Sequence, residues 1–323
     1  MKADSSVLVG DVGGTHARFA IVDVSANPFK ISHRAELSSE AFEAFTDVLR
    51  AYLDQNRLSG QPHAASIAVA GPVTNGTVLF TNRDWTVSED DLRKLGFRRA
   101  LLINDFAALA FSVSSLDPAS LHTIGPRLEG LDGEPITILG AGTGFGVSCL
   151  ARYRGRSIPV ATEGGHIGFA PRGSDQIAVL EVLAKRFEHV SVERVLSGPG
   201  LENIYTALEE IAGRKTDALE APEIQSAALT GNPIAAAALN MFCQIYGTVA
   251  GDFALAHGAR GGVYIAGGIA AKIEPFLIKS GFRTQFENKG RLSHFVKLIP
   301  TRLILSPDAA FLGAAQASLE FAS

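Results

Sequence analysis

The sequence predicts an α/β protein built from two lobes around a cleft. Three observations lead to this prediction. The chain has 323 residues, and at roughly 100–200 residues per domain this length favours two domains. Strand-like and helix-like segments follow one another in a mixed order that occurs twice. A strand, a glycine-rich turn and a second strand occur near the start, and a similar pattern returns from residue 137.

The first lobe is predicted to begin with a hairpin and to continue with alternating strands and helices. Short apolar runs bounded by turn residues predict strands at 7–9, 17–24, 66–70 and 100–104. Apolar residues at helical spacing, or start signals, predict helices at 40–54, at 87–96 and from 106 onward. Ser88 and Asp91 predict a capping box for the second of these helices.

The second lobe repeats the opening unit of the first. TILGAGTGFGVSCLARY (137–153), laid beside VLVGDVGGTHARFAIVD, indicates an internal duplication of pattern. The elements predicted after it are helices at 176–188, 198–212 and 232–257, strands at 262–269 and 302–306, and a closing helix at 309–321. We expect the closing helix to pack back on the first lobe.

Composition excludes several classes of function. A net charge of -4 leaves no basic surplus to neutralise a nucleic-acid backbone. The two cysteines, Cys149 and Cys243, form no C-x-x-C pair, which disfavours structural zinc and a disulfide framework. No signal-peptide pattern precedes the first strand, and no apolar run approaches the roughly 20 residues of a membrane span. We therefore expect a cytoplasmic protein without a nucleic-acid or membrane partner.

Glycine clusters in turns that suit an anion. The chain has 33 glycines, above the roughly 7% of average usage. A glycine-rich turn exposes several backbone N–H groups on one side, and such a concavity binds phosphate. GDVGGT (10–15) and GAGTG (140–144) are two such turns. One alone is as easily a plain hairpin turn, but two in matching positions of duplicated lobes predict a polyphosphate held from both sides.

Other nucleotide-binding signatures do not occur in the sequence. There is no G-x-x-x-x-G-K-[ST] motif, so a P-loop is excluded. The glycines in GAGTGFG never give G-x-G-x-x-G, and this turn leads into a strand rather than a helix. The protein-kinase signatures are also missing.

Polar residues interrupt apolar or glycine-rich sequence at several points. Asn104 and Asp105 close a strand and open the next helix, so Asp105 is either a helix-end residue favoured by the dipole or a general base in the cleft. Glu163 and His166 lie three residues apart around two glycines, and a loop hydrogen bond is the structural alternative for this pair. Glu193 lies between valines, and pairing with Arg194 or with a backbone amide is its structural alternative. Together these amides, carboxylates and imidazole suit an uncharged polyhydroxylated ligand.

Seven motifs resemble those of a known family. They are GDVGGTHAR, LLINDF, GAGTGFG, TEGGH, SVERVLSGPG, GVYIAGGI and FLGAA. In this order, across essentially the whole chain, they resemble the bacterial glucokinases of the proteobacterial type, within the actin-like, sugar-kinase ATPase superfamily. The resemblance implies two RNase-H-like lobes around a central cleft, a small lobe of residues 1–112 plus 307–323 and a large lobe of residues 113–306.

The resemblance also implies an activity and residue roles. The γ-phosphoryl group of ATP would pass to the 6-hydroxyl of glucose, with Mg²⁺ as cofactor, and the enzyme would be a homodimer. Asp105 matches the catalytic base and Asn104 its sugar-binding neighbour, while Glu163, His166 and Glu193 match the other sugar ligands. The matched nucleotide residues are Gly10, Asp11, Val12, Gly13, Gly14 and Thr15 in the first phosphate loop, Gly142, Thr143 and Gly144 in the second, and Gly267 and Gly268 near the adenosine. Asp11 is expected to reach the metal through water.

Two residues depart from the family pattern. His16 replaces the asparagine expected after GGT, and Thr162 stands where glycine often precedes EGGH. Neither change removes a group that carries chemistry. The cysteine-rich zinc motif of the related repressor–kinase group is absent from the sequence.

Three rival functions differ from this interpretation. A sugar-responsive regulator needs a DNA-binding module, and we expect no room for one before the first strand near Ser6. A nucleotide-dependent chaperone or filament protein would keep the phosphate turns but has no use for the polar set. A kinase for another hexose, such as fructose or mannose, stays open, because discrimination depends on a few hydroxyl contacts.

Overall fold

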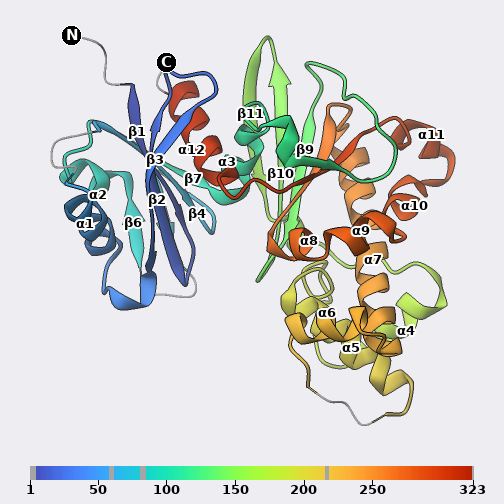
Figure 1. Cartoon of the computed structure of the whole chain (residues 1–323). Coiled ribbons are helices and arrows are strands. Elements are labelled where there is room, and N and C mark those ends of the chain that lie inside the picture. Colours follow the sequence, from blue (N-terminus) through green and yellow to red (C-terminus); the bar gives the residue numbers. More distant parts are fainter. Residues whose placement is uncertain (1–4, 58–61, 81–84, 215–217, 322–323) are drawn as a thin grey trace. The chain divides into compact units, whose positions relative to one another are not determined.

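The computed structural model describes residues 5–57, 62–80, 85–214 and 218–321. The chain divides into two compact units, coloured along the sequence in Figure 1. Unit 1 comprises Met1–Ser120, Ser157–Ala161 and Ser306–Ser323, and unit 2 comprises Leu121–Arg156 and Thr162–Leu305. Each unit combines a central sheet with helices, which confirms the predicted α/β class.

The sheet of unit 1 has the strand order β3-β2-β1-β4-β7. Its strands are β1 (Ser6–Val12), β2 (His16–Asp23), β3 (Lys30–Ser38), β4 (Ala64–Val69) and β7 (Arg99–Asn104). The first three pair antiparallel, and β4 and β7 continue the sheet in parallel to β1. The predicted hairpin is confirmed, because Val12 lies opposite Ala17 across the GDVGGT turn. A separate ribbon pairs β5 (Thr77–Leu79) with β6 (Thr86–Ser88).

Helices cover both faces of this sheet. They are η1 (Ser39–Ala41), α1 (Phe45–Gln55), α2 (Glu89–Lys94), α3 (Asp105–Ser112), η2 (Pro118–Ser120) and α12 (Ala309–Glu320). Leu8 of β1 packs in a core with Leu49 of α1, whereas its neighbour Val9 packs in a second core with Phe311 of α12. Alternate strand residues point to opposite faces, so α1 and α12 lie on opposite sides of the sheet.

The closing helix α12 lies beside α3 (Figure 1). A Cβ atom at Gly313 would come within 1.7 Å of the carbonyl oxygen of Ala108, so only glycine permits this approach of the two helices. The contact fixes α3, the helix that begins with Asp105, against the sheet.

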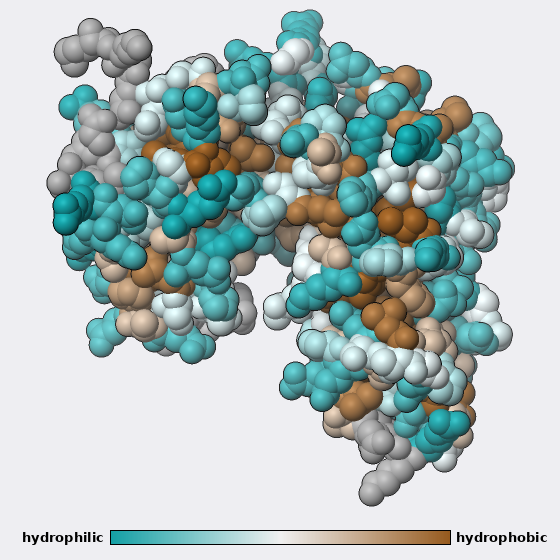
Figure 2. All heavy atoms as spheres, viewed as in Figure 1, coloured by the Kyte–Doolittle hydropathy of each residue, from teal (hydrophilic) through white to brown (hydrophobic). Residues whose placement is uncertain are grey.

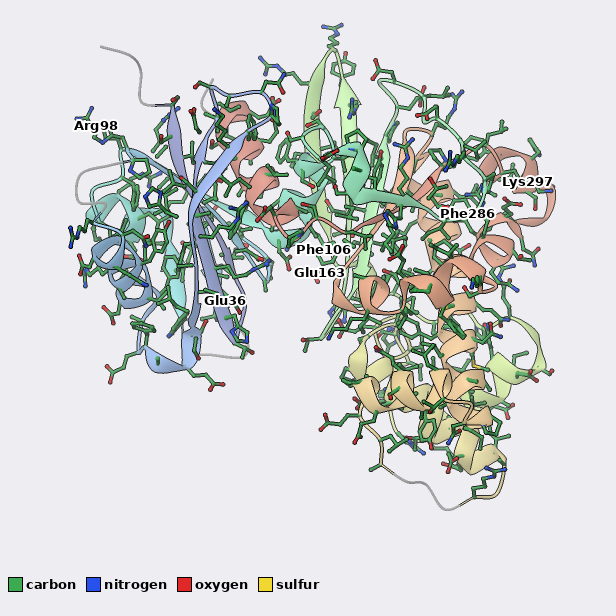
Figure 3. The ribbon with its side chains drawn as sticks, in the orientation of Figure 1. Glu36, Arg98, Phe106, Glu163, Phe286 and Lys297 are labelled. Atoms are coloured by element: carbon green, nitrogen blue, oxygen red, sulfur yellow. The ribbon has the colours of Figure 1, made fainter. Side chains whose placement is uncertain are left out.

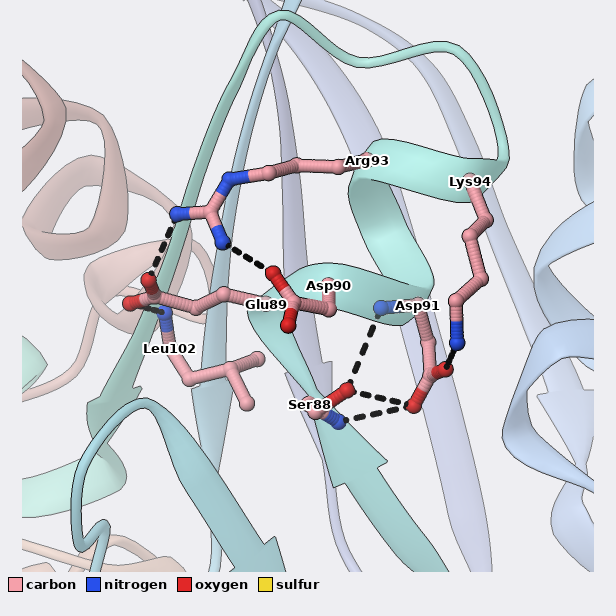
Figure 4. A network of polar contacts seen from close by, with 7 residues as sticks. All are labelled: Ser88, Glu89, Asp90, Asp91, Arg93, Lys94 and Leu102. Carbon is pink, nitrogen blue, oxygen red and sulfur yellow. Dashed lines mark hydrogen bonds and ion pairs between the residues drawn. The ribbon is translucent and has the colours of Figure 1, made fainter.

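Helix α2 shows the predicted capping box (Figure 4). The Asp91 amide donates to Ser88 Oγ at 3.1 Å, and the Ser88 amide donates to Asp91 Oδ2 at 3.2 Å. The hydroxyl of Ser88 also donates to Asp91 and is the largest of the effects that lower the pKa of this carboxyl below its usual range. Glu89 accepts a hydrogen bond from the Leu102 amide at 3.3 Å, which fastens α2 to β7.

The second sheet has the strand order β11-β10-β9-β12-β13-β8. Its strands are β8 (Leu121–Thr123), β9 (Ile136–Ala141), β10 (Phe145–Tyr153), β11 (Arg156–Thr162), β12 (Gly262–Ala266) and β13 (Thr301–Ile304). β9 and β10 pair antiparallel, and β12 and β13 continue in parallel to β9. The first five strands therefore follow the order found in unit 1, in agreement with the predicted duplication.

Unit 2 carries most of the helices. They are η3 (Gly164–His166), α4 (Gly173–Ala184), α5 (Gly198–Ile211), α6 (Ala221–Leu229), α7 (Pro233–His257), α8 (Gly268–Lys272), α9 (Glu274–Lys279), α10 (Phe282–Glu287), η4 (Gly290–Leu292) and α11 (Ser293–Val296). The buried ring of Tyr246 in α7 meets Phe145, Phe242 and Phe282 edge-on, at centroid distances of 5.7, 6.0 and 5.8 Å.

Helix α7 corrects one expectation from the sequence. Among the described residues it is the one helix long and apolar enough to cross a membrane, so the statement that no segment reaches this length is wrong for α7. However, 72% of its apolar window is buried inside the protein, as in the core helix of a globular unit. On the face shown in Figure 2, hydrophobic residues are exposed in small groups between hydrophilic ones.

Several boundaries differ from those predicted; the helix predicted at 176–188, for example, is α4 at Gly173–Ala184. The strand predicted at 262–269 ends at Ala266, because Gly267 has a positive φ of 91° and is the N-cap of α8. The helix predicted from residue 40 begins at Phe45, after the short η1 turn. Strands β3 and β11 were not predicted, because all of their residues are exposed or half-buried and no clear apolar period marks them.

Candidate active site

The predicted site residues form two groups, one in each unit. Unit 1 holds residues 10–15, Asn104 and Asp105; unit 2 holds Gly142–Gly144, Glu163, His166, Glu193, Gly267 and Gly268. Each group gathers at one edge of the sheet of its own unit, as described below.

In unit 1 the strand register places the two parts of the group at the same edge. Val12 is paired with Val69, and Val69 is paired with Asn104, so the GDVGGT turn and the end of β7 lie two strands apart. With neighbouring strands about 4.8 Å apart, this separation is about 10 Å. Ligands of α/β sheets gather at this carboxyl edge of the parallel strands.

The GDVGGT turn is closed by its own backbone. The Gly13 amide donates to the carbonyl of His16 at 3.0 Å. Gly10 lies against Ile67 of β4, since a Cβ atom there would come within 2.8 Å of the isoleucine side chain. Gly10 thus packs within the sheet as part of β1, and further along the turn Gly14 is half-buried and Thr15 is exposed.

Asp11 has a partner that the sequence analysis missed. Its carboxylate forms an ion pair with Arg18, whose Nε lies 3.1 Å from Oδ2. The two residues are directly opposite each other in the β1–β2 hairpin, so the hairpin register alone would have revealed the pair. The Arg18 guanidinium also lies 5.6 Å from the ring centroid of Phe311 in α12. Arg18 thus fixes the carboxylate next to the turn.

His16, the first departure from the family pattern, forms an exposed contact. Its Nδ1 lies 3.2 Å from Glu36 Oε1 on the neighbouring strand β3, and both side chains are 58% exposed. The His16 side chain therefore links the end of the GDVGGT turn to β3 by a solvent-exposed contact.

Asn104 caps helix α3, and Asp105 is its first residue. The Asn104 Oδ1 accepts hydrogen bonds from the amides of Phe106 and Ala107 at 3.0 and 3.1 Å; Phe106 is labelled in Figure 3. Its Nδ2 donates to the carbonyl of Gly71 at 3.2 Å and to Asp105 Oδ1 at 3.0 Å. Of the two alternatives for this pair, capping is thus realised by Asn104, and the cap also orients the Asp105 carboxylate.

The carboxylate of Asp105 is held from two sides. Besides the bond from Asn104, its Oδ1 accepts the amide hydrogen of Phe106 at 2.9 Å. Its position at the first turn of α3 places a negative charge where the helix dipole favours one. A helix-end role and a role as a base are therefore compatible in the same residue.

In unit 2 the β9–β10 turn forms the corresponding backbone concavity. The Gly142 amide donates to the Gly144 carbonyl at 2.8 Å, and the Gly198 amide at the start of α5 donates to the Gly142 carbonyl, also at 2.8 Å. Thr143 is exposed at the tip. Gly267 packs against the end of β9, because a Cβ atom there would come within 2.4 Å of the Ala141 carbonyl oxygen. The two predicted nucleotide turns of this unit are therefore neighbours.

Tyr246 of α7 supports both of these turns and was missed by the sequence analysis. Its hydroxyl oxygen accepts the Ala141 amide hydrogen at 3.2 Å, and its O–H donates to the Ala266 carbonyl at 3.5 Å. Ala141 and Ala266 are the last residues of β9 and β12. Burial raises the pKa of the Tyr246 hydroxyl, so it stays a neutral donor and acceptor.

The TEGGH loop presents two of the predicted polar side chains. Glu163 (labelled in Figure 3) precedes the short η3 turn and His166 is its last residue, with the His166 amide donating to the Glu163 carbonyl at 3.0 Å. Their side chains are 69% and 62% exposed, and their closest charged atoms are 4.0 Å apart. The loop therefore holds a carboxylate and an imidazole side by side, both open to solvent.

Both glycines of this loop are required by packing. A Cβ atom would come within 2.7 Å of the Phe253 ring at Gly164, and within 2.1 Å of the Phe145 carbonyl oxygen at Gly165. The Gly165 carbonyl in turn accepts the Glu193 amide hydrogen at 2.9 Å. The structure thus brings Glu163, His166 and Glu193 together around the start of β10.

Thr162, the second departure from the family pattern, fastens the same loop. Its hydroxyl donates to the Val147 carbonyl of β10 at 3.0 Å and accepts the Gly164 amide hydrogen at 3.2 Å. A glycine has no side chain to form either bond. In this chain the strand end before Glu163 is therefore held by a side chain as well as by the sheet.

Three comparisons place the chain among known proteins. A family model described as Glucokinase matches residues 8–320. The chain is 47% identical over 311 residues to the glucokinase of Caulobacter sp. (strain K31), covering 96% of this chain and 94% of that protein. The crystal structure of a glucokinase from an Antarctic psychrotroph is 36% identical and has a TM-score of 0.88, covering 97% of this chain and 98% of that one.

A more distant structure shares the fold. A glucokinase of the ROK family from Streptomyces griseus, solved in complex with glucose and AMPPNP, has a TM-score of 0.65 at 20% identity, over 97% of this chain and 98% of that one. These relatives confirm the predicted actin-like sugar-kinase fold and identify the chain as an enzyme. From the sequence, the fold and these relatives we conclude that this protein belongs to the glucokinase family.

Proposed function

We propose that the chain transfers the γ-phosphoryl group of ATP to the 6-hydroxyl of D-glucose, giving glucose 6-phosphate and ADP, with Asp105 as the general base. The observation that carries the proposal is the arrangement in unit 1. The Asp105 carboxylate is oriented by Asn104 at the same sheet edge as the GDVGGT turn. The family supports glucose as the sugar, and the AMPPNP bound by the Streptomyces griseus relative supports a triphosphate nucleotide.

The two glycine-rich turns would hold the triphosphate. Each is closed by its own backbone hydrogen bond, from the Gly13 amide in one unit and from the Gly142 amide in the other, and a glycine-rich turn of this kind would offer its remaining N–H groups to phosphate. Gly267 and Gly268 would lie beside the adenosine. Phosphoryl transfer depends mainly on positioning and charge neutralisation, and these turns supply the positioning.

Asp11 fits the role of the metal-anchoring residue. Mg²⁺ usually keeps several waters and takes one or two carboxylates together with substrate phosphates, so a single carboxylate beside a phosphate turn is a suitable donor set. When bound, the ion would neutralise charge on the phosphate oxygens. Asp11 would reach it through water, with Arg18 holding the carboxylate in place.

The polar set would bind the sugar hydroxyls. Glu163 and His166 project from one loop, and Glu193 lies against the same loop. A carboxylate accepts two hydroxyls and an imidazole offers a donor and an acceptor, which suits an uncharged hexose. Asn104 would contact the sugar next to Asp105, and Asp105 would accept the proton of the attacking hydroxyl.

The remaining proposals follow from the family resemblance. The catalytic lobes would be residues 1–112 plus 307–323 and residues 113–306. The enzyme would act in the cytoplasm as a homodimer in glycolysis. Rates of ADP release with glucose, fructose and mannose, each with ATP and Mg²⁺, test the choice of sugar; faster turnover of another hexose would replace glucose in this proposal.

Substitution of Asp105 tests the mechanism. Asp105→Ala is expected to lower kcat by about 10²–10⁴-fold, the usual contribution of a general base. Asp105→Asn keeps an oxygen that accepts the Phe106 amide hydrogen but cannot accept the sugar proton, so it is expected to be equally inactive while preserving the start of α3. Circular dichroism would verify the fold of both variants. Wild-type turnover in Asp105→Asn would exclude Asp105 as the base.

A further inference from the structure

Glu193 contacts both the second phosphate turn (residues 142–144) and the TEGGH loop (residues 162–166), which we call the sugar-type loop. Its Oε2 accepts the backbone amide hydrogen of Phe145, the residue that follows the Gly142–Gly144 turn, at 2.9 Å. A Cβ atom at Gly144 would come within 2.6 Å of the same oxygen. The carboxylate therefore lies against the turn, and a larger residue at position 144 would displace it.

The backbone of Glu193 is fixed at both of its polar groups. Its amide donates to the Gly165 carbonyl of the TEGGH loop at 2.9 Å. Its carbonyl accepts the Ser197 hydroxyl hydrogen at 2.8 Å, and Ser197 caps helix α5. One residue thus connects the sugar-type loop, the phosphate turn and the start of a helix.

The N-terminus of α5 completes this connection. The Gly198 amide donates to the Gly142 carbonyl at 2.8 Å, so the helix start holds the first residue of the turn, while the Glu193 carboxylate binds the residue after the turn. Two bonds from the segment 193–198 therefore fix the turn at both of its ends. A shift of the Glu193 side chain toward a ligand would release the Phe145 amide, and with it one end of the turn.

We propose that Glu193 is a positioning residue for the second phosphate turn, so that sugar binding at Glu193 and nucleotide binding at Gly142–Gly144 are energetically coupled through this carboxylate. The inference rests on the proposed function, in which Glu193 is a sugar ligand. It adds a second role: the residue shapes the nucleotide site even when no sugar is present. Because coupling is reciprocal, glucose and nucleotide must each alter the affinity for the other by the same factor.

The test measures ADP affinity by titration calorimetry on the full-length enzyme with Mg²⁺ and without sugar. Glu193→Ala removes the acceptor for the Phe145 amide and is expected to weaken ADP binding by about 5-fold to about 150-fold, the usual penalty for leaving a hydrogen-bond donor without a partner. Glu193→Gln keeps an oxygen acceptor and removes a negative charge near the phosphates, so it is expected to bind ADP at least as tightly as wild type.

Glu163→Ala is the matched control. Glu163 is also a proposed sugar ligand, but its exposed side chain points to His166 and has no contact with the turn among the described bonds. It is expected to raise the KM for glucose and to leave ADP affinity without sugar unchanged. Equal ADP affinity in Glu193→Ala and wild type would overturn the inference.

A second variant keeps the test decisive if Glu193→Ala does not fold. Gly144→Ala places a methyl group against the Glu193 carboxylate and is expected to weaken both ADP and glucose binding. An unchanged glucose affinity in Gly144→Ala would refute the coupling. Failure of the wild type itself to bind ADP would instead refute the proposed function, so the two failures are distinguishable.

Discussion

Replacing Gly165 by alanine is expected to disable the enzyme through the position of the TEGGH loop. The Cβ atom of the alanine would lie 2.1 Å from the Phe145 carbonyl oxygen, whereas real Cβ contacts essentially never fall below 3.0 Å. The difference means that the loop or the strand must move by about 0.9 Å. The displaced segment carries Glu163 and His166 and accepts the amide hydrogen of Glu193.

The size of the effect follows from this displacement. A misplacement of about 1 Å at a reacting site can cost about 10²-fold in rate, so kcat/KM for glucose is expected to fall by about that factor. Overpacking of this kind typically lowers the free energy of unfolding by about 1–3 kcal/mol. Initial rates of ADP release with glucose varied would measure the first effect, and urea denaturation the second.

Gly168→Ala provides the matched control in the same segment. A Cβ atom there would meet His189 at 3.7 Å, an ordinary contact, so this variant is expected to keep wild-type activity and stability. If Gly165→Ala retained the wild-type kcat/KM, the reasoning that this loop must be held against Phe145 for glucose to bind would be refuted.

Three further changes have expected outcomes. Asn104→Ala removes the side-chain cap of α3 and is expected to lower the free energy of unfolding by about 0.5–2 kcal/mol, measured with urea; an unchanged value would show that the cap adds no stability. Thr162→Val, which lacks the loop-fastening hydroxyl, is expected to raise the KM for glucose, while Thr162→Ser is not; equal KM values would contradict this role. Burial lowers the pKa of His257 in the folded protein, so the unfolded chain binds a proton on this imidazole more readily, and stability is expected to fall as the pH drops below about 6.5. Thermal midpoints measured across this pH range should decline less in His257→Gln than in the wild type.

The sequence predicted the parts of the structure that local physics determines. The hairpin around GDVGGT follows from apolar strands on both sides of a glycine turn, and the capping box of α2 follows from Ser88 and Asp91 alone. The Asn104–Asp105 pair was recognised as a helix end or a base, and the structure shows the helix end directly. The base and the other site roles stay predictions, which the experiments above test.

Other features depend on contacts between distant segments. Tyr246 lies 105 residues from Ala141, whose amide it binds, and no local pattern marks that tyrosine as a support of the phosphate turn. The contact of Glu193 with Phe145 spans 48 residues and appears only once β10 and the segment before α5 are folded together. The pair of Asp11 and Arg18 is different, since the predicted hairpin already places the two residues opposite each other.

The return of α12 to unit 1 has a consequence during synthesis on the ribosome. Helix α12 packs on α3 through Gly313 and supplies Phe311 to the core behind β1, yet almost all of unit 2 is translated between Ser120 and Ser306. At the usual speed of translation, the nascent first sheet waits on the order of tens of seconds for its covering helix. Its face with Val7, Val9 and Ala64 stays uncovered by α12 for that time, so the emerging polypeptide presents a binding surface for chaperones before the enzyme is complete.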